Sequence, residues 1–139
     1  MPVIAFTTAL LVLKQVLLVV LQGGTRVRTG QFAKEEDARA FRGKAGGDAP
    51  IVELAQHVIR NGLENEPIFL ILLLVVHGAM PDTDLGPYAW TFVAARYLHA
   101  LFFLRRSQPM RTIAYTVGFA AMVGLAVQLA LYALPQLGG

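Results

Sequence analysis

The chain is built from long apolar runs separated by short polar connections. Four runs have the length, about 20 mostly apolar residues, that a helix needs to cross a bilayer. They cover residues 3–21, 51–80, 88–104 and 110–134. The pattern predicts an all-α integral membrane protein in which residues 1–139 form one domain, a bundle of four transmembrane helices.

The composition favours a membrane protein over a soluble one. Of the residues, 55% are hydrophobic and 15% are charged, and the mean hydropathy is +0.55, outside the range of ordinary soluble domains. The first run has no basic segment before it and carries Lys14 in its middle, so we interpret it as a retained span. The pI of about 9.6 does not indicate a nucleic-acid partner, because the basic residues form no helical patch with interleaved aromatics.

The basic residues mark one side of the membrane. The connection MPDTDLG has none, whereas Arg105 and Arg106 lie between the third and fourth runs. Six more occupy the loop 26–50: Arg26, Arg28, Lys34, Arg39, Arg42 and Lys44. Because Lys and Arg are enriched in cytoplasmic loops, we expect both basic loops in the cytoplasm and both termini on the opposite side. The short loops favour a bacterial inner membrane, and the loop segment EEDARAFR predicts a short surface helix.

The second apolar run carries a polar stripe. At about 100° per residue, five polar side chains fall within an arc of about 100°: Glu53, His57, Arg60, Asn61 and Glu64. Ionisable groups inside a span are costly and usually line a cavity or a site. We therefore expect function along this stripe, and we expect Pro67 to kink or widen the helix beside it.

The other spans bring polar groups to the same depth, near the predicted cytoplasmic side. These are Arg26 on the first, Arg96 and His99 on the third with Phe103 on the same face, and Arg111, Thr112 and Tyr115 on the fourth. Arginines are permanent cations whose planar donors suit carboxylates, while Asn61 and Glu64 can hold amides and an ammonium group. This inventory predicts a small zwitterionic ligand such as a peptide. An arginine facing a thiol would also stabilise the nucleophilic thiolate.

Some of these residues also have structural interpretations. Arg111 can be a membrane-end arginine that reaches the interface, and His99 can be a helix-packing residue. Lys14 lies about 18 Å from Arg26 at 1.5 Å per residue, so it is deep in its span. It needs an acidic partner, and Glu66 has a comparable depth.

A metal site is not expected on the polar stripe. His57 and Glu64 share a face, but no second histidine or cysteine accompanies them at ligand spacing. Four arginines nearby would also repel a cation.

Three stretches resemble the MAPEG family, the membrane-associated proteins in eicosanoid and glutathione metabolism. They are RVRTGQFAKEEDARAF, VELAQHVIRNGLENEPIFL and ARYLHALFFLRRSQPMR with the following TIAY. The chain is most similar to the branch of microsomal glutathione transferases and microsomal prostaglandin E synthases. The resemblance implies a four-helix subunit that forms a homotrimer, with glutathione bound between neighbouring subunits near the cytoplasmic face.

The resemblance also implies residue roles. Arg111 would stabilise the thiolate with Thr112 as a helper, and Asp37 ranks lower as a third catalytic candidate. Glu53 and Arg96 match positions that are structural, and Phe103 stands where close relatives have a tyrosine. The implied glutathione contacts are Arg26, Arg60, Asn61, Glu64, His99, Arg111, Thr112 and Tyr115.

Two functions from different classes follow. The first is a membrane-bound glutathione transferase or peroxidase, or a related isomerase, which activates glutathione for attack on a hydrophobic electrophile or lipid hydroperoxide. The alternative is a non-catalytic binding or scaffold protein that retains a glutathione-like pocket. An ion path is disfavoured, because the far halves of the spans offer little besides His77, Gln128 and Tyr132.

Overall fold

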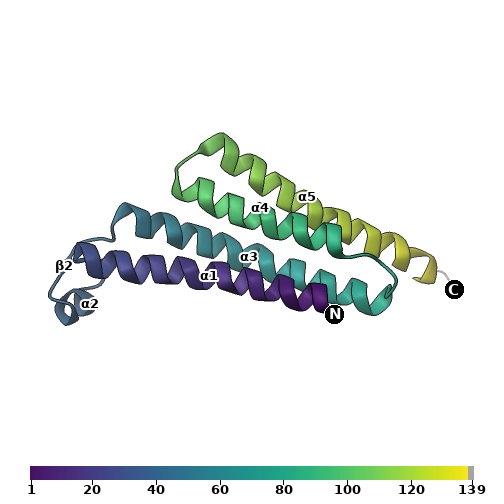
Figure 1. Ribbon diagram of the computed structural model, residues 1–139, viewed down its shortest axis with the longest axis horizontal. Coiled ribbons are helices and arrows are strands. Elements are labelled where there is room, and N and C mark those ends of the chain that lie inside the picture. The colour runs from purple at the N-terminus through teal and green to yellow at the C-terminus, as the bar shows by residue number, and fades with distance from the viewer. Residues whose placement is uncertain (138–139) are drawn as a thin grey trace.

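The computed structural model describes residues 1–137, which form four long helices and a small folded connection (Figure 1). The long helices are α1 (Pro2–Thr29), α3 (Pro50–Ala79), α4 (Gly86–Leu104) and α5 (Gln108–Ala133), and the 3₁₀ helix η1 (Leu134–Leu137) follows α5. Between α1 and α3 lie β1 (Gln31–Phe32), α2 (Glu35–Ala40) and β2 (Lys44–Ala45). The predicted all-α fold is confirmed.

Prolines open all four long helices, at Pro2, Pro50, Pro87 and Pro109. Proline suits the first turn because the N–H that it lacks would have no helical partner there and its φ is already helical. The interior Pro67 does not terminate its helix, since α3 is one helix from Pro50 to Ala79. The expected disturbance at Pro67 therefore does not interrupt α3.

Helix α1 is longer than its apolar run. We expected the span to end near residue 21 and a connector to begin at Arg26, but α1 continues to Thr29 and Arg26 belongs to its last turn. Gly30 ends the helix with a left-handed φ of 64°, and its backbone N–H donates to the Arg26 carbonyl at 2.9 Å. The connector is corrected to residues 30–49, because hydropathy reports the apolar limit and not the helix end.

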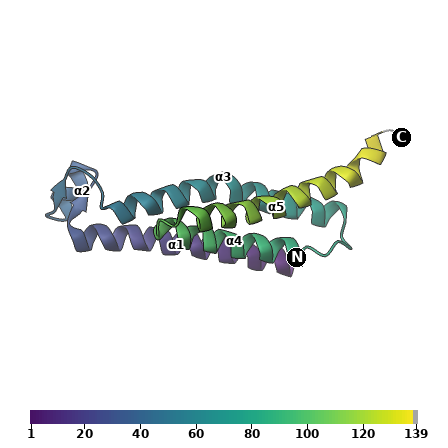
Figure 2. The ribbon, with the colours of Figure 1, turned by 90° about the horizontal axis from the view of Figure 1, so that it is seen from above.

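The long helices form two antiparallel pairs. α1 packs along α3, and α4 packs along α5, with the α4–α5 hairpin lying over the α1–α3 pair in Figure 1. Within residues 1–137, no Cα atom of α1 lies within 8 Å of a Cα atom of α5. Both basic connections lie at the same end of the bundle, opposite the α3–α4 turn, and α1 and α3 extend beyond the α4–α5 turn (Figures 1 and 2).

The core follows helical stripes. α1 buries residues at spacings of three and four, namely Ile4, Thr7, Leu11, Lys14 and Leu18. At the centre, Phe69 of α3 stacks on Phe92 of α4 with ring centroids 3.8 Å apart. The outer faces of all the long helices still expose large apolar side chains, as expected of helices that contact lipid or other subunits.

Three helical segments of the described chain are long and apolar enough to cross a membrane. They are α1, α3 and the segment Gln108–Leu137, which joins α5 to η1. The 19-residue α4 carries the buried polar residues Arg96 and His99, and it does not meet the same criterion. The fourth span therefore stays a prediction.

The connection between α1 and α3 is folded. β1 and β2 pair in parallel, with Gln31 opposite Lys44 and Phe32 opposite Ala45. Phe32 is buried. The expected surface helix is confirmed as α2. This unit fixes the position of α2 and of the segment that enters α3.

Candidate functional site

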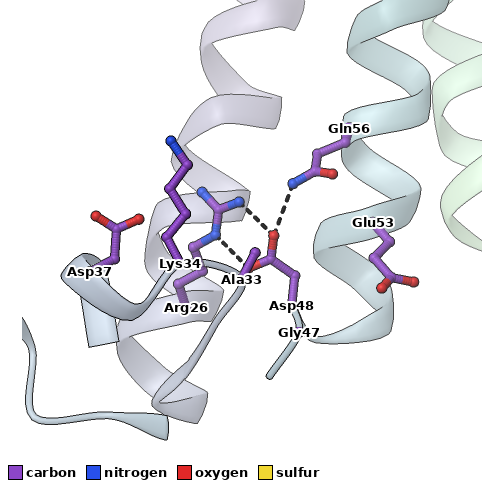
Figure 3. Close-up of a pocket in the computed structure, with 8 residues that line it drawn as sticks. All are labelled: Arg26, Ala33, Lys34, Asp37, Gly47, Asp48, Glu53 and Gln56. Atoms are coloured by element: carbon purple, nitrogen blue, oxygen red, sulfur yellow. Dashed lines mark hydrogen bonds and ion pairs between the residues drawn. The ribbon is translucent and has the colours of Figure 1, made fainter. Parts of the chain in front are cut away.

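A polar pocket lies where the connection meets α1 and α3 (Figure 3). Its volume is about 460 Å³, and it is lined by Arg26, Ala33, Lys34, Asp37, Gly47, Asp48, Glu53 and Gln56. Arg26 comes from the last turn of α1, Asp37 from α2 and Gln56 from α3. The structure thus brings together two residues implied by the family resemblance, Arg26 and Asp37.

Within this pocket Arg26 forms a bidentate ion pair with Asp48. The Arg26 Nε donates to Asp48 Oδ1 at 2.7 Å and its NH2 donates to Oδ2 at 2.6 Å. Gln56 Nε2 donates to the same Oδ2 at 2.9 Å. The Asp48 side chain is only 4% exposed, and the hydrogen bonds from Arg26 hold the pKa of its carboxyl below the usual value of 3.8.

Two glycines deliver Asp48 to Arg26. Gly46 and Gly47 have φ values of 131° and 139°, a backbone conformation that L side chains rarely adopt. They turn the chain between β2 and α3 so that Asp48 reaches across to the end of α1. Sequence reasoning missed both Asp48 and Gln56, and the Gly-Gly-Asp run was the one local signal for the turn.

A second group of polar residues lies deeper, between α3, α4 and α5. Arg96 NH1 donates to Asn61 Oδ1 at 3.0 Å, and the Arg96 guanidinium carbon lies 4.8 Å from the Phe92 ring centroid and 5.4 Å from that of Tyr115. Arg96 is 2% exposed. These contacts fit the structural role expected for Arg96. The hydrogen bond also engages the side-chain oxygen of Asn61, a residue expected to contact the ligand.

The His99 side chain contacts the backbone of Arg111. His99 Nδ1 lies 3.2 Å from the Arg111 carbonyl oxygen, and the His99 and Tyr115 rings are 5.8 Å apart. The Arg111 guanidinium lies 4.5 Å from the Phe103 ring centroid and also donates to Gln108 Oε1. A phenylalanine thus supplies a π face to Arg111, where a tyrosine would add a hydroxyl.

Thr112, Arg60 and Glu64 lie on exposed faces. The Thr112 hydroxyl donates to the Gln108 carbonyl at 3.2 Å. Arg60 Nε lies 3.5 Å from Glu64 Oε1, and the two side chains are 82% and 61% exposed. An exposed pair of this kind adds little stability, so both side chains are available to a ligand or a neighbouring subunit.

The predicted site is therefore divided within one subunit. Arg26 and Asp37 face the pocket at the connection, whereas His99, Arg111 and Tyr115 gather on α4 and α5. The helices that carry Arg26 and Arg111, α1 and α5, have no pair of Cα atoms within 8 Å of each other in the described part of the chain.

The deeper group also offers polar atoms to a ligand. Among residues 1–137, His99 Nε2 and the Nε and NH2 of Arg96 are buried and have no hydrogen-bond partner. Buried polar atoms are usually paired. The two Arg96 groups are donors suited to an anion or to ordered water, whereas His99 Nε2 is an acceptor because Nδ1 donates to the Arg111 carbonyl. No three His, Cys, Asp or Glu side chains converge in a metal-binding arrangement in that same range.

Comparisons with known proteins cover nearly the whole chain. A model of the MAPEG family matches residues 4–131. The chain is 30% identical over 132 residues to prostaglandin E synthase of Equus caballus and 29% identical over 132 residues to that of Bos taurus, covering 93% of this chain and 86% of each relative. It is 27% identical over 135 residues to prostaglandin E synthase of Macaca fascicularis, covering 93% of this chain and 87% of that relative.

Proposed function

The chain belongs to the MAPEG family, and from this premise we propose that it is a membrane-bound glutathione transferase or peroxidase. Glutathione is the cosubstrate, and the second substrate is a hydrophobic electrophile or lipid hydroperoxide that arrives from the bilayer. The similarity to prostaglandin E synthases supports a glutathione-linked enzyme and keeps a related isomerase activity as a variant of the same chemistry.

The observation that carries the proposal is the grouping of Arg111, His99 and Tyr115 at the start of α5. Arg111 supplies a permanent cation, and His99 holds the Arg111 backbone from α4. A cation beside a thiol lowers the cost of forming the thiolate, especially where water is scarce. The unpartnered His99 Nε2 adds an acceptor for an N–H of the same ligand, because Nδ1 carries the proton that is donated to the Arg111 carbonyl.

The chemistry assigned to this group is activation of the thiol. The glutathione thiol loses its proton, and the thiolate sulfur forms a bond to an electrophilic carbon or to the distal oxygen of a hydroperoxide. In the first case the carbon's bond to a leaving group, or its π or ring bond, breaks, and the released electron pair takes up a proton or departs with the leaving group. In the second case the O–O bond breaks, the substrate leaves as an alcohol after taking a proton, and a second glutathione completes the reduction to water and glutathione disulfide. Thr112 is assigned as a helper whose hydroxyl hydrogen turns from the Gln108 carbonyl, to which it donates here, towards the sulfur.

The division of the site supports assembly from more than one subunit. We assign Arg26 and Asp37 to one face of the glutathione site and Arg111, Thr112 and Tyr115 to the other, with Arg60, Asn61 and Glu64 between them. A homotrimer in which neighbouring copies complete each site satisfies this arrangement. The basic connections are assigned to the cytoplasmic side of a bacterial inner membrane.

The test is an ultraviolet difference spectrum of glutathione titrated into the purified protein. The native protein should show thiolate absorbance, Arg111→Ala should lose it, and the exposed neighbour Arg105→Ala should keep it as the matched control. Binding without any thiolate signal in the native protein would instead favour a non-catalytic binding protein, an alternative for which the contact of Arg111 with Phe103 gives a structural reason. Absence of glutathione binding would refute both functions.

A further inference from the structure

We propose that Asp48 is the positioning residue for Arg26, holding its guanidinium so that its remaining donors can bind a carboxylate of the ligand in the polar pocket. The inference rests on the proposed glutathione function and deepens it.

The geometry leaves Arg26 partly committed and partly free. A guanidinium has five N–H donors, and Asp48 takes one from Nε and one from NH2. The other three make no hydrogen bond to a side chain within residues 1–137, and the Arg26 side chain remains 28% exposed while it lines the pocket. Arg26 can therefore keep its two hydrogen bonds to Asp48 and donate to a second carboxylate at the same time.

Asp48 itself is fixed by three different parts of the chain. Gly46 and Gly47 set the backbone that leads to it, Gln56 of α3 donates to its Oδ2, and Arg26 of α1 binds both oxygens. Figure 3 shows the carboxylate between Arg26 and Gln56. A side chain held in this way restricts the rotamers of its partner, and a restricted arginine loses less freedom when it binds a ligand.

The charges around the pocket support a positioning role over charge balance alone. Asp37 already interacts electrostatically with Arg26, and Glu53 is a further carboxylate in the pocket lining, so neutralisation does not require a buried aspartate. Asp48 differs from these two because it binds the guanidinium through both oxygens, which fixes the plane of the guanidinium.

The experiment compares Asp48→Asn with the native protein in glutathione binding, measured by calorimetry on the full-length protein in lipid nanodiscs. Asparagine keeps the shape of aspartate, but it is uncharged and its amide nitrogen cannot accept a hydrogen bond from Arg26. We therefore expect Asp48→Asn to bind glutathione about tenfold more weakly. Glutathione diethyl ester, in which both carboxylates are blocked, should bind the two proteins equally. The matched control is Glu35→Gln, which breaks the exposed ion pair with Arg39 on α2.

Turnover separates positioning from a general loss of structure. If Asp48 acts through Arg26, Asp48→Asn should raise KM for glutathione and leave kcat within about twofold, because chemistry is assigned to Arg111. Equal glutathione affinity in Asp48→Asn and the native protein would overturn the inference, and tighter binding would do so too, by showing that Asp48 competes with the ligand. A native protein that binds no glutathione would instead count against the proposed function.

Discussion

Lys14 of α1 and Glu66 of α3 form a 2.6 Å ion pair whose side chains are only 4% and 7% exposed. Gln15 Nε2 donates to the other Glu66 oxygen at 3.3 Å. The sequence had indicated this pair, because a lysine in the middle of a span needs an acidic partner at the same depth. The structure confirms it and shows that it links α1 to α3.

Breaking this pair on one side should destabilise the protein. Lys14→Met leaves Glu66 buried without its countercharge, which is expected to cost about 3–5 kcal/mol of unfolding free energy. The double variant Lys14→Met with Glu66→Met removes both charges and should recover most of that loss. The measurement is equilibrium unfolding in detergent, and a double variant no more stable than Lys14→Met would show that the charges are not coupled.

Gly62 should be needed for the same contact between α1 and α3. A Cβ at Gly62 would collide with Gln15 Nε2 and lie 2.9 Å from Glu66 Oε1 and 3.2 Å from Lys14 Nζ. Gly62→Ala is therefore expected to destabilise the protein by about 1–3 kcal/mol through overpacking. Gly78→Ala, on the same helix with nothing within 4 Å of its Cβ, is the control and should be neutral or stabilising. Equal effects of the two substitutions in thermal unfolding would contradict this prediction.

Asn61 should contribute to stability as well as to ligand binding. Asn61→Ala removes the acceptor of the buried Arg96 NH1, and loss of a hydrogen bond to a charged group should cost about 1.5–3 kcal/mol. Asn65→Ala is the control, because the Asn65 amide donates only to the Asn61 carbonyl one turn earlier on the same helix. If unfolding shows no difference between the two variants, Asn61 does not support Arg96.

The contact between Arg26 and Asp48 should make stability depend on pH in the acid range. The pKa of Asp48 is below its usual value of 3.8 because Arg26 binds its ionised form. Its contribution is therefore present above the unfolded-state pKa and is lost as pH falls through the lower folded-state pKa. The difference in melting temperature between the native protein and Asp48→Asn should shrink as the pH is lowered below about 4. A difference that stays constant across this range would mean that Asp48 does not titrate with the fold.

The positions of the long helices were predictable because each depends on a local pattern. A run of about 20 apolar residues must bury its backbone polar groups as a helix in lipid, and proline at the start of each run fixes where the helix begins. The end of α1 was less predictable, since Gly30 and not the apolar limit terminates it. α4 was placed correctly, and it is the one long helix of residues 1–137 that does not meet the length and hydropathy criteria for a membrane span.

The candidate site was predictable only in part. Arg96, His99 and Phe103 share a face because helical spacing requires it, and the structure places His99 beside Tyr115 and Phe103. The pairing of Arg26 with Asp48 was not predictable, because it depends on a turn with two positive φ values and on how the connection folds back over α1. No helical periodicity relates those two positions.

The sequence alone therefore determined the helices, the buried charge that needed a partner, and the family to which the chain belongs, because each is encoded in local spacing or in motifs. The tertiary structure decided which groups meet. It paired Asp48 with Arg26 and Asn61 with Arg96. It also placed Arg26 and Arg111 on two helices whose Cα atoms do not come within 8 Å of each other in the described residues. These relations depend on helix packing and on the path of the connection, which are set by the whole chain and not by any single segment.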